Sequence, residues 1–133
     1  MNSIVFPKGI PGFEEEKEFV LKEEAGTPFA QLDSVKRKEI GFILLRPQFF
    51  FPEYLKRVDV SPEEVELLEI REKEQVDVWG IMTLCLSDMV RSTVNLRAPL
   101  LINTRTMKGV QIILDDEGYT PRQPVFGDGQ NSS

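Results

Sequence analysis

The segment TVNLRAPLLINTRTMKGVQIIL, Thr93–Leu114, decides how the rest of this sequence is interpreted. It alternates apolar and polar residues as a β-strand does, yet it carries Pro99 between two asparagines, and its charged residues are all basic. Proline cannot donate a hydrogen bond to a neighbouring strand, so Pro99 is expected at a strand start, a bulge or an edge. The side chains of Asn95 and Asn103 can bind loop backbone on either side of it. We therefore predict that this segment forms the corner of a sheet.

A second interpretation of the same segment stays open. The outward polar groups of Thr93, Asn95 and Arg97 can line an edge or rim that meets the backbone of a partner. We assign corner geometry to Pro99 and the apolar residues after it, and partner contact only to the three outward side chains.

The rest of the chain predicts a mostly β protein. Short apolar stretches are separated by Gly, Pro and Asp residues, which is typical of a sandwich or a barrel. Gly80 lies in the middle of an eleven-residue strand pattern and predicts a bulge or bend. The predicted fold is a small single-domain antiparallel β-barrel-like fold with one or two short helices over residues 1–126, followed by a disordered tail at 127–133. The expected strands include 18–22, 40–45, 76–86 and 109–114.

One helix is predicted by the stretch SPEEVELLEI, which begins at Ser61. Ser61 suits the N-cap, the proline after it suits the first helical position, and Glu64 completes a capping box. Val65 and Leu68 are expected to form the buried edge of this helix. A second helical turn is expected in the preceding segment PEYLKR.

The composition excludes several kinds of chemistry. The 133 residues contain no histidine, which is the commonest general base and the commonest zinc ligand. The single cysteine, Cys85, lies in an apolar run and is expected to be a buried structural thiol. There is no Walker loop and no Cys-x-x-Cys pair. We predict that the protein is not an enzyme, has no catalytic residues and holds no metal or cofactor.

The net charge of −6 argues against direct binding to nucleic acid, because phosphate binding rests on Lys and Arg. It favours a basic protein partner instead. No apolar run approaches the length of a membrane span, and the first ten residues lack the apolar core of a secretory signal. A cytoplasmic location without a membrane partner is therefore expected.

The charges are distributed unevenly along the chain. Glu14–Glu24 contains six Glu and two Lys, and Asp59–Asp77 contains eight acids and two bases. Arg91–Lys108, by contrast, contains four basic residues and no acid. Scattered surface charge and a binding module with two faces would both give this pattern.

Aromatic residues cluster in the stretch RPQFFFPEY, which includes Phe50, Phe51 and Tyr54. Strand alternation can bury only one or two of them on the same face. Exposed members of the cluster would be natural anchors for a partner, whereas a closed core or a folded-over loop would bury them all.

Five stretches of the sequence are specific in combination and weak singly. They are IVFPKGIPGFEEEKEFVL, PFAQLDS, FFPEYLKRV, TVNLRAPLLINTRTMKGVQIIL and YTPRQPVF. Taken together, they resemble the FliW family of bacterial flagellar assembly factors, and the match runs in order from Ile4 to about Phe126.

The resemblance implies a cytoplasmic, non-enzymatic β-barrel protein with two partners. One is flagellin, which is held before export. The other is the carbon storage regulator CsrA, a small dimeric RNA-binding protein that represses flagellin translation. Once flagellin leaves, the free protein binds CsrA away from its RNA groove and relieves the repression.

We combine this implication with the residue analysis to predict the binding residues. Acidic groups docked near the RNA groove of CsrA would repel phosphate over about 8 Å at physiological salt. A rim without acids would avoid repelling an acidic flagellin segment. The predicted electrostatic contacts are Glu14, Glu15, Glu16 and Glu53, the apolar anchors are Phe50, Phe51 and Tyr54, and the rim residues are Thr93, Asn95 and Arg97.

Two other functions stay open at this stage. A small barrel can also be a flavin-type cofactor-binding enzyme module, which the yellow colour of a bound flavin would reveal. The segment Arg91–Lys108 could instead bind RNA directly, although no aromatic residues are interleaved with its bases.

Overall fold

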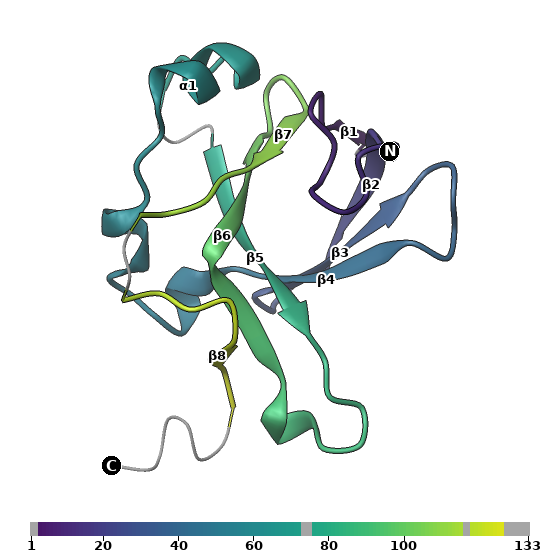
Figure 1. The fold of residues 1–133 in the computed structure, drawn as a ribbon, viewed down its shortest axis with the longest axis vertical. Helices are drawn as coiled ribbons and strands as arrows, with labels where there is room; N and C mark the ends of the chain where they lie inside the picture. The colour runs from purple at the N-terminus through teal and green to yellow at the C-terminus, as the bar shows by residue number, and fades with distance from the viewer. Residues whose placement is uncertain (1–2, 73–75, 116–117, 127–133) are drawn as a thin grey trace.

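A closed β-barrel forms the body of the molecule in the computed structural model, which describes residues 3–72, 76–115 and 118–126. The strands follow the order β5-β4-β3-β2-β1-β7-β6-β8, and an additional β5–β6 pairing closes β1 to β7 into the barrel (Figure 1). The pairings are antiparallel except for β1 with β7. The predicted fold class is therefore confirmed. The strands are β1 (Ser3–Val5), β2 (Glu18–Glu23), β3 (Phe29–Ser34), β4 (Gly41–Leu45), β5 (Val76–Thr83), β6 (Thr93–Asn103), β7 (Lys108–Gln111) and β8 (Gln123–Pro124).

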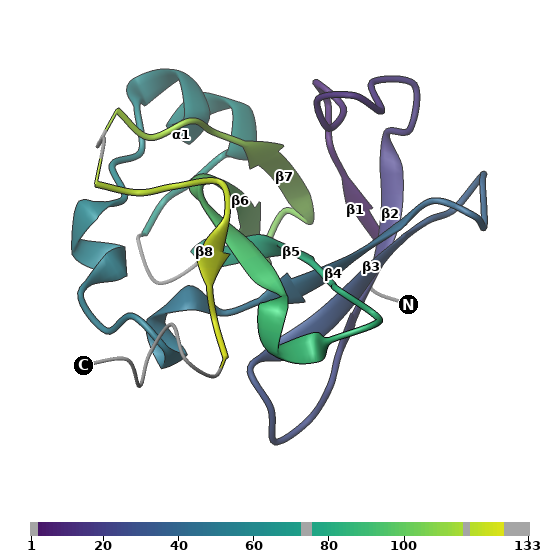
Figure 2. The same ribbon diagram turned by 60° about the horizontal axis from the view of Figure 1, so that its bottom comes forward.

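The helix and the two 3-10 turns between β4 and β5 lie on one side of the barrel, whereas the 3-10 turn between β5 and β6 lies apart from them, at the end of the molecule opposite α1 (Figures 1 and 2). The helix α1 (Pro62–Leu68) begins with the predicted capping box, in which Ser61 and Glu64 each accept a hydrogen bond from the other's backbone N–H. The 3-10 turns are η1 (Pro47–Phe49), η2 (Tyr54–Arg57) and η4 (Met89–Arg91). The predicted turn in PEYLKR is η2.

A bulge in β6 determines which side chains of this strand face the barrel interior and which face the other side of the wall. Trp79 of β5 pairs with Leu100, and Ile81 pairs with Asn95, so two steps along β5 correspond to five along β6. Because β6 carries three extra residues, an odd number, its alternation of faces is inverted across the bulge. We call the bulged residues 96–99 the β6 corner. It contains Pro99, as predicted.

The inversion divides the apolar side chains of β6 between two cores. Leu100 and Ile102 lie in the barrel interior with Phe6, Phe19 and Trp79. The outer core covers the other side of the wall and is closed by the helical segments and the C-terminal residues of the described chain. It includes Val94, Leu96, Leu101, Val110, Ile112, Leu114, Tyr54, Leu68 and Val125.

The end of α1 is fixed to the β6–β7 turn by a buried asparagine. Asn103 Nδ2 donates to the carbonyl of Leu68 at 2.8 Å, and its Oδ1 accepts from the N–H of Arg105 at 2.8 Å. Lys108 Nζ lies 2.6 Å from the carboxylate of Glu69, the left-handed residue that ends the helix. The bond from Asn103 to Leu68 satisfies one of the carbonyl groups that every helix end leaves without an intrahelical partner.

Some expectations about single residues differ from the structure. β5 ends at Thr83, and Cys85 lies half-buried in the following loop, with its Sγ 3.6 Å from Ser87 Oγ. Hydrogen bonding to Ser87, assisted by the charge of Arg91, lowers the pKa of this thiol. The prediction of a buried cysteine was therefore wrong. In α1, Leu68 is buried as predicted, but Val65 is 37% exposed. The tail predicted to be disordered, 127–133, lies outside the described residues.

Gly80 provides a test of the β5–β6 crossing. A Cβ at this position would lie 2.5 Å from Cγ2 of Val94, which is in the outer core. We expect Gly80→Ala to lower the free energy of unfolding by roughly 1–3 kcal/mol in urea denaturation, because the core has no room for the methyl group. Combining it with Val94→Ala should cost less than the sum of the single changes. If the two losses in the free energy of unfolding were fully additive, the close approach to Val94 would not be what excludes a side chain at position 80.

Candidate functional site

The β6 corner keeps its carbonyl groups satisfied although it leaves the regular strand ladder. Each of its four carbonyl groups accepts a hydrogen bond from a residue outside the corner. A buried acceptor without a partner would cost roughly 1–3 kcal/mol, so these bonds are a condition for burying the corner. The acceptor and donor pairs are Leu96 O with Tyr54 Oη (2.5 Å), Arg97 O with Leu114 N (2.8 Å), Ala98 O with Gln111 Nε2 (2.9 Å) and Pro99 O with Ile112 N (3.0 Å).

The N–H groups of the corner are satisfied in a similar way. Asn95 Oδ1 accepts from the N–H of Arg97 and of Ala98, both at 3.0 Å. Leu96 N donates to the carbonyl of Thr120 at 3.1 Å, and Pro99 has no N–H. The predicted architectural role of this segment is therefore present in the structure. The side-chain oxygen of Asn95 binds backbone within the corner and is not free for a partner. Thr93 and Arg97 are half-buried.

The aromatic segment packs directly beside this corner. Tyr54 is only 1% exposed, and its ring meets that of Tyr119 edge-on at a centroid distance of 4.9 Å. Phe50 makes a similar edge-on contact with Phe126 at 6.3 Å. Phe51 is half-buried against the outer core. The structure thus brings the predicted apolar anchors and the predicted rim residues together on one side of the barrel.

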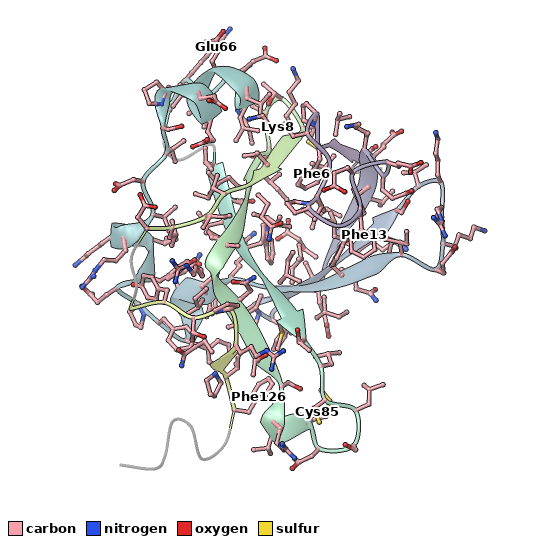
Figure 3. The ribbon with its side chains drawn as sticks, in the orientation of Figure 1. Phe6, Lys8, Phe13, Glu66, Cys85 and Phe126 are labelled. Atoms are coloured by element: carbon pink, nitrogen blue, oxygen red, sulfur yellow. The ribbon has the colours of Figure 1, made fainter. Side chains whose placement is uncertain are left out.

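The burial of Tyr54 leaves it no surface to offer a partner, which differs from its prediction as an anchor. Phe50 and Phe51 keep part of their surface accessible, and their neighbour Phe49 is 63% exposed. Tyr119 and Phe126 had no predicted role, although both belong to the stretch YTPRQPVF that contributed to the resemblance. Figure 3 shows Phe126 near Cys85, at the end of the molecule opposite α1.

The acidic loop, Glu14–Glu16, lies on the other side of the barrel, beside β1 and β2 (Figures 1 and 2). Glu14 and Glu15 are exposed, but Glu16 is only 5% exposed and accepts a hydrogen bond from Ser34 Oγ at 2.7 Å. Glu16 was predicted as a partner contact, and its burial instead makes it an anchor of the loop. Glu53 is exposed on the helical side, where it pairs with Lys56 at 2.9 Å. The four predicted carboxylates therefore do not form one surface.

The acidic loop is held in a defined conformation. Gly9 adopts a positive φ of 69°, which a side chain would oppose, and Phe13 N donates to the carbonyl of Ile10 at 2.7 Å. The N–H of Gly12 donates to Glu14 Oε2 at 3.1 Å, and this hydrogen bond is the main cause that lowers the pKa of Glu14. The Glu14 carboxylate therefore stays ionised at pH values below those at which a glutamate usually takes up a proton.

The basic segment Arg91–Lys108 does not form one patch. Arg91 lies in η4, and Arg97 lies at the β6 corner. Arg105 Nη2 donates to the carbonyl of Glu69 at 2.7 Å, and Lys108 pairs with the carboxylate of the same residue. Two of the four bases therefore hold the end of α1, and the segment offers no continuous positive surface for RNA.

The described residues offer little for metal chemistry. Within residues 3–72, 76–115 and 118–126, no group of three His, Cys, Asp or Glu side chains is placed to hold a metal ion. None of the helices in these ranges is long and apolar enough to cross a membrane.

Comparison with known proteins gives a consistent result over nearly the whole chain. The family profile described as "FliW protein" matches residues 1–125. The flagellar assembly factor FliW of Bacillus licheniformis is 42% identical over 127 residues, covering 95% of this chain and 87% of the relative. That of Bacillus subtilis is 38% identical over 126 residues, covering 94% and 86%. A crystal structure of the flagellar assembly factor FliW superposes with a TM-score of 0.86 at 36% identity, covering 95% of this chain and 86% of the other.

The hydrogen bond from Tyr54 to the β6 corner predicts a pH dependence of stability. Burial, with a smaller contribution from Tyr119, raises the pKa of Tyr54 above its ordinary value of 10. The folded state therefore holds the phenolic proton more tightly than the unfolded state, and this contribution is complete below pH 10 and is lost as the pH rises beyond it. Urea unfolding between pH 8 and 11 should show a decline in the wild-type protein that is smaller in Tyr54→Phe.

The same variant has a second expected effect at neutral pH. Tyr54→Phe leaves the carbonyl of Leu96 without its donor, so the free energy of unfolding should fall by roughly 1–3 kcal/mol. Tyr119→Phe is the matched control, because it removes a hydroxyl from the same ring pair. Equal losses in the two variants would contradict a special role for the bond to Leu96.

Proposed function

Since the chain belongs to the FliW family of flagellar assembly factors, we propose that it is a non-catalytic cytoplasmic protein that exchanges between two partners. It holds flagellin before export. When flagellin leaves, it binds CsrA and relieves the repression of flagellin translation. The level of unexported flagellin thereby controls flagellin synthesis.

The observation that supports this proposal best is the way the acidic loop is displayed. Buried Glu16 and the bond from Gly12 fix the loop, so Glu14 and Glu15 project as charged groups that need little further ordering on binding. A preorganised negative surface suits a basic RNA-binding protein, and it speeds their encounter. Placed near an RNA groove, the two carboxylates also disfavour phosphate over roughly a Debye length, about 8 Å.

The β6 corner supports a second, separate contact. Phe49, Phe50 and Phe51 offer aromatic surface in the segment that packs on the β6 corner through Tyr54, and the corner carries Arg97. This combination of aromatic and basic groups suits a partner segment with apolar and acidic residues, as proposed for flagellin. Two surfaces of different chemistry allow two partners to be told apart, and the exchange then requires that a partner on one surface disfavours binding at the other.

The exchange itself is tested by competition between purified partners. We expect the protein to bind CsrA and flagellin separately in isothermal titration calorimetry. Saturation with flagellin should then lower its apparent affinity for CsrA at least tenfold. Binding of both partners at once, each with unchanged affinity, would contradict the exchange.

The role of the acidic loop is tested by charge reversal. We expect Glu14→Lys combined with Glu15→Lys to weaken CsrA binding about tenfold or more and to reduce its dependence on salt. The matched control combines Glu24→Lys with Asp88→Lys, which change the net charge equally at exposed positions outside the loop. A CsrA affinity that is indifferent to salt in the wild-type protein would reject the electrostatic contact.

A further inference from the structure

A groove of about 380 Å³ lies between η2, α1 and β5. Its walls are almost entirely aliphatic, and the side chains that form them are half-buried or exposed. Leu55 is 41% exposed and Val65 is 37% exposed, so the walls retain apolar surface open to solvent. The lining residues are Leu55, Val58, Asp59, Val60, Val65, Ile70, Val76 and Val78.

The chemistry of the groove does not suit a small polar ligand. Sites for small molecules combine apolar walls with several convergent polar groups that fix the orientation of the ligand. Among the described residues that line the groove, Asp59 is the one polar residue. The groove instead suits aliphatic side chains inserted from another protein, which need no hydrogen bonds.

The charge around the groove indicates what kind of segment it receives. The residues 58–70, which supply much of the wall, contain five acids and no base. Three of these acids are engaged within the protein: Glu63 with Lys8, Glu64 in the capping box, and Glu69 with Lys108. Asp59 and Glu66 are exposed, and no ion pair is recorded for either within the described part of the chain. Glu66 lies on α1 at the outer edge of the molecule (Figure 3).

Basic groups are also present nearby. Lys56 on η2 is paired with Glu53, and Arg57 and Arg71 have interactions of their own. Asp59 lines the groove and Glu66 follows Val65 on α1, and we call these two exposed carboxylates the acidic rim.

We propose that this groove binds aliphatic side chains of a short basic segment of the RNA-binding partner, while Asp59 and Glu66 pair with the Lys or Arg residues that flank them. The inference rests on the proposed function, because that function supplies the basic partner. Burial of inserted aliphatic side chains against the exposed walls provides affinity, and the acidic rim selects a basic segment over an acidic one. The groove adds a contact to the same partner as the acidic loop, so the loss of either contact weakens binding.

Two variants with matched controls test the groove in the complete protein. Val65→Lys places a charge in the wall, and Asp59→Lys with Glu66→Lys reverses the rim. We expect each to weaken CsrA binding at least tenfold. Ile113→Lys, at a position 74% exposed outside the groove, and Glu24→Lys with Asp88→Lys should change it less than twofold. Unchanged thermal unfolding confirms that the variants fold. Wild-type affinity in both groove variants would overturn the inference.

A second measurement keeps this test separate from the proposed function. Methyl NMR spectra of the wild-type protein are recorded with a synthetic amphipathic peptide of Leu and Lys, and with its Leu and Glu counterpart. We expect the methyl signals of Val58, Val60, Val65 and Ile70 to shift with the Lys peptide only. Failure of CsrA to bind the wild-type protein would contradict the proposed function alone. Groove methyl signals that stay unmoved by the Lys peptide, or that shift equally with both peptides, would overturn the groove as a site for basic segments.

Discussion

The whole structure depends on the burial of the β6 corner without loss of its hydrogen bonds. Residues 96–99 leave the strand ladder, yet each of their carbonyls and N–H groups finds a partner in the side chain or backbone of another segment. Each such group would cost roughly 1–3 kcal/mol if it were buried alone. Asn95 and Tyr54 are decisive, because their side chains replace partners that a regular strand would supply.

The corner determines which side chains reach which core. Because the bulge adds an odd number of residues, Val94 and Leu96 before it reach the outer core, whereas Leu100 and Ile102 after it reach the barrel interior. The outer core must then be covered, and the segments around η1, η2, α1 and the end of the described chain supply this cover. The cover is incomplete between η2 and α1, which is where the aliphatic groove lies. The barrel, its second core and the groove thus follow from one local irregularity.

Much of the fold could be predicted from the sequence, because the deciding features are local. Pro99 cannot donate to a ladder, Gly80 permits a close crossing, and the residues around Ser61 form a capping box. The burial of single candidate residues could not be predicted, because it depends on partners distant in the chain. Glu16 is buried by a bond to a residue 18 positions away, and Tyr54 by one to a residue 42 positions away. No periodicity within either segment reveals such a partner.

The distribution of charge over the surface likewise depends on tertiary contacts that the local sequence pattern does not show. The acidic stretches look uniform in the sequence, but the fold separates their members into two groups. Glu16 fixes the acidic loop, Glu63 forms a long-range ion pair with Lys8, and Glu69 pairs with Lys108 at the end of α1. Glu14, Glu15, Asp59 and Glu66 remain displayed to solvent. The basic stretch is divided likewise, since Arg105 and Lys108 both bind Glu69 at the end of α1. Among the described residues, the carboxylates that the fold leaves displayed without an ion pair therefore lie at positions that net charge alone does not identify.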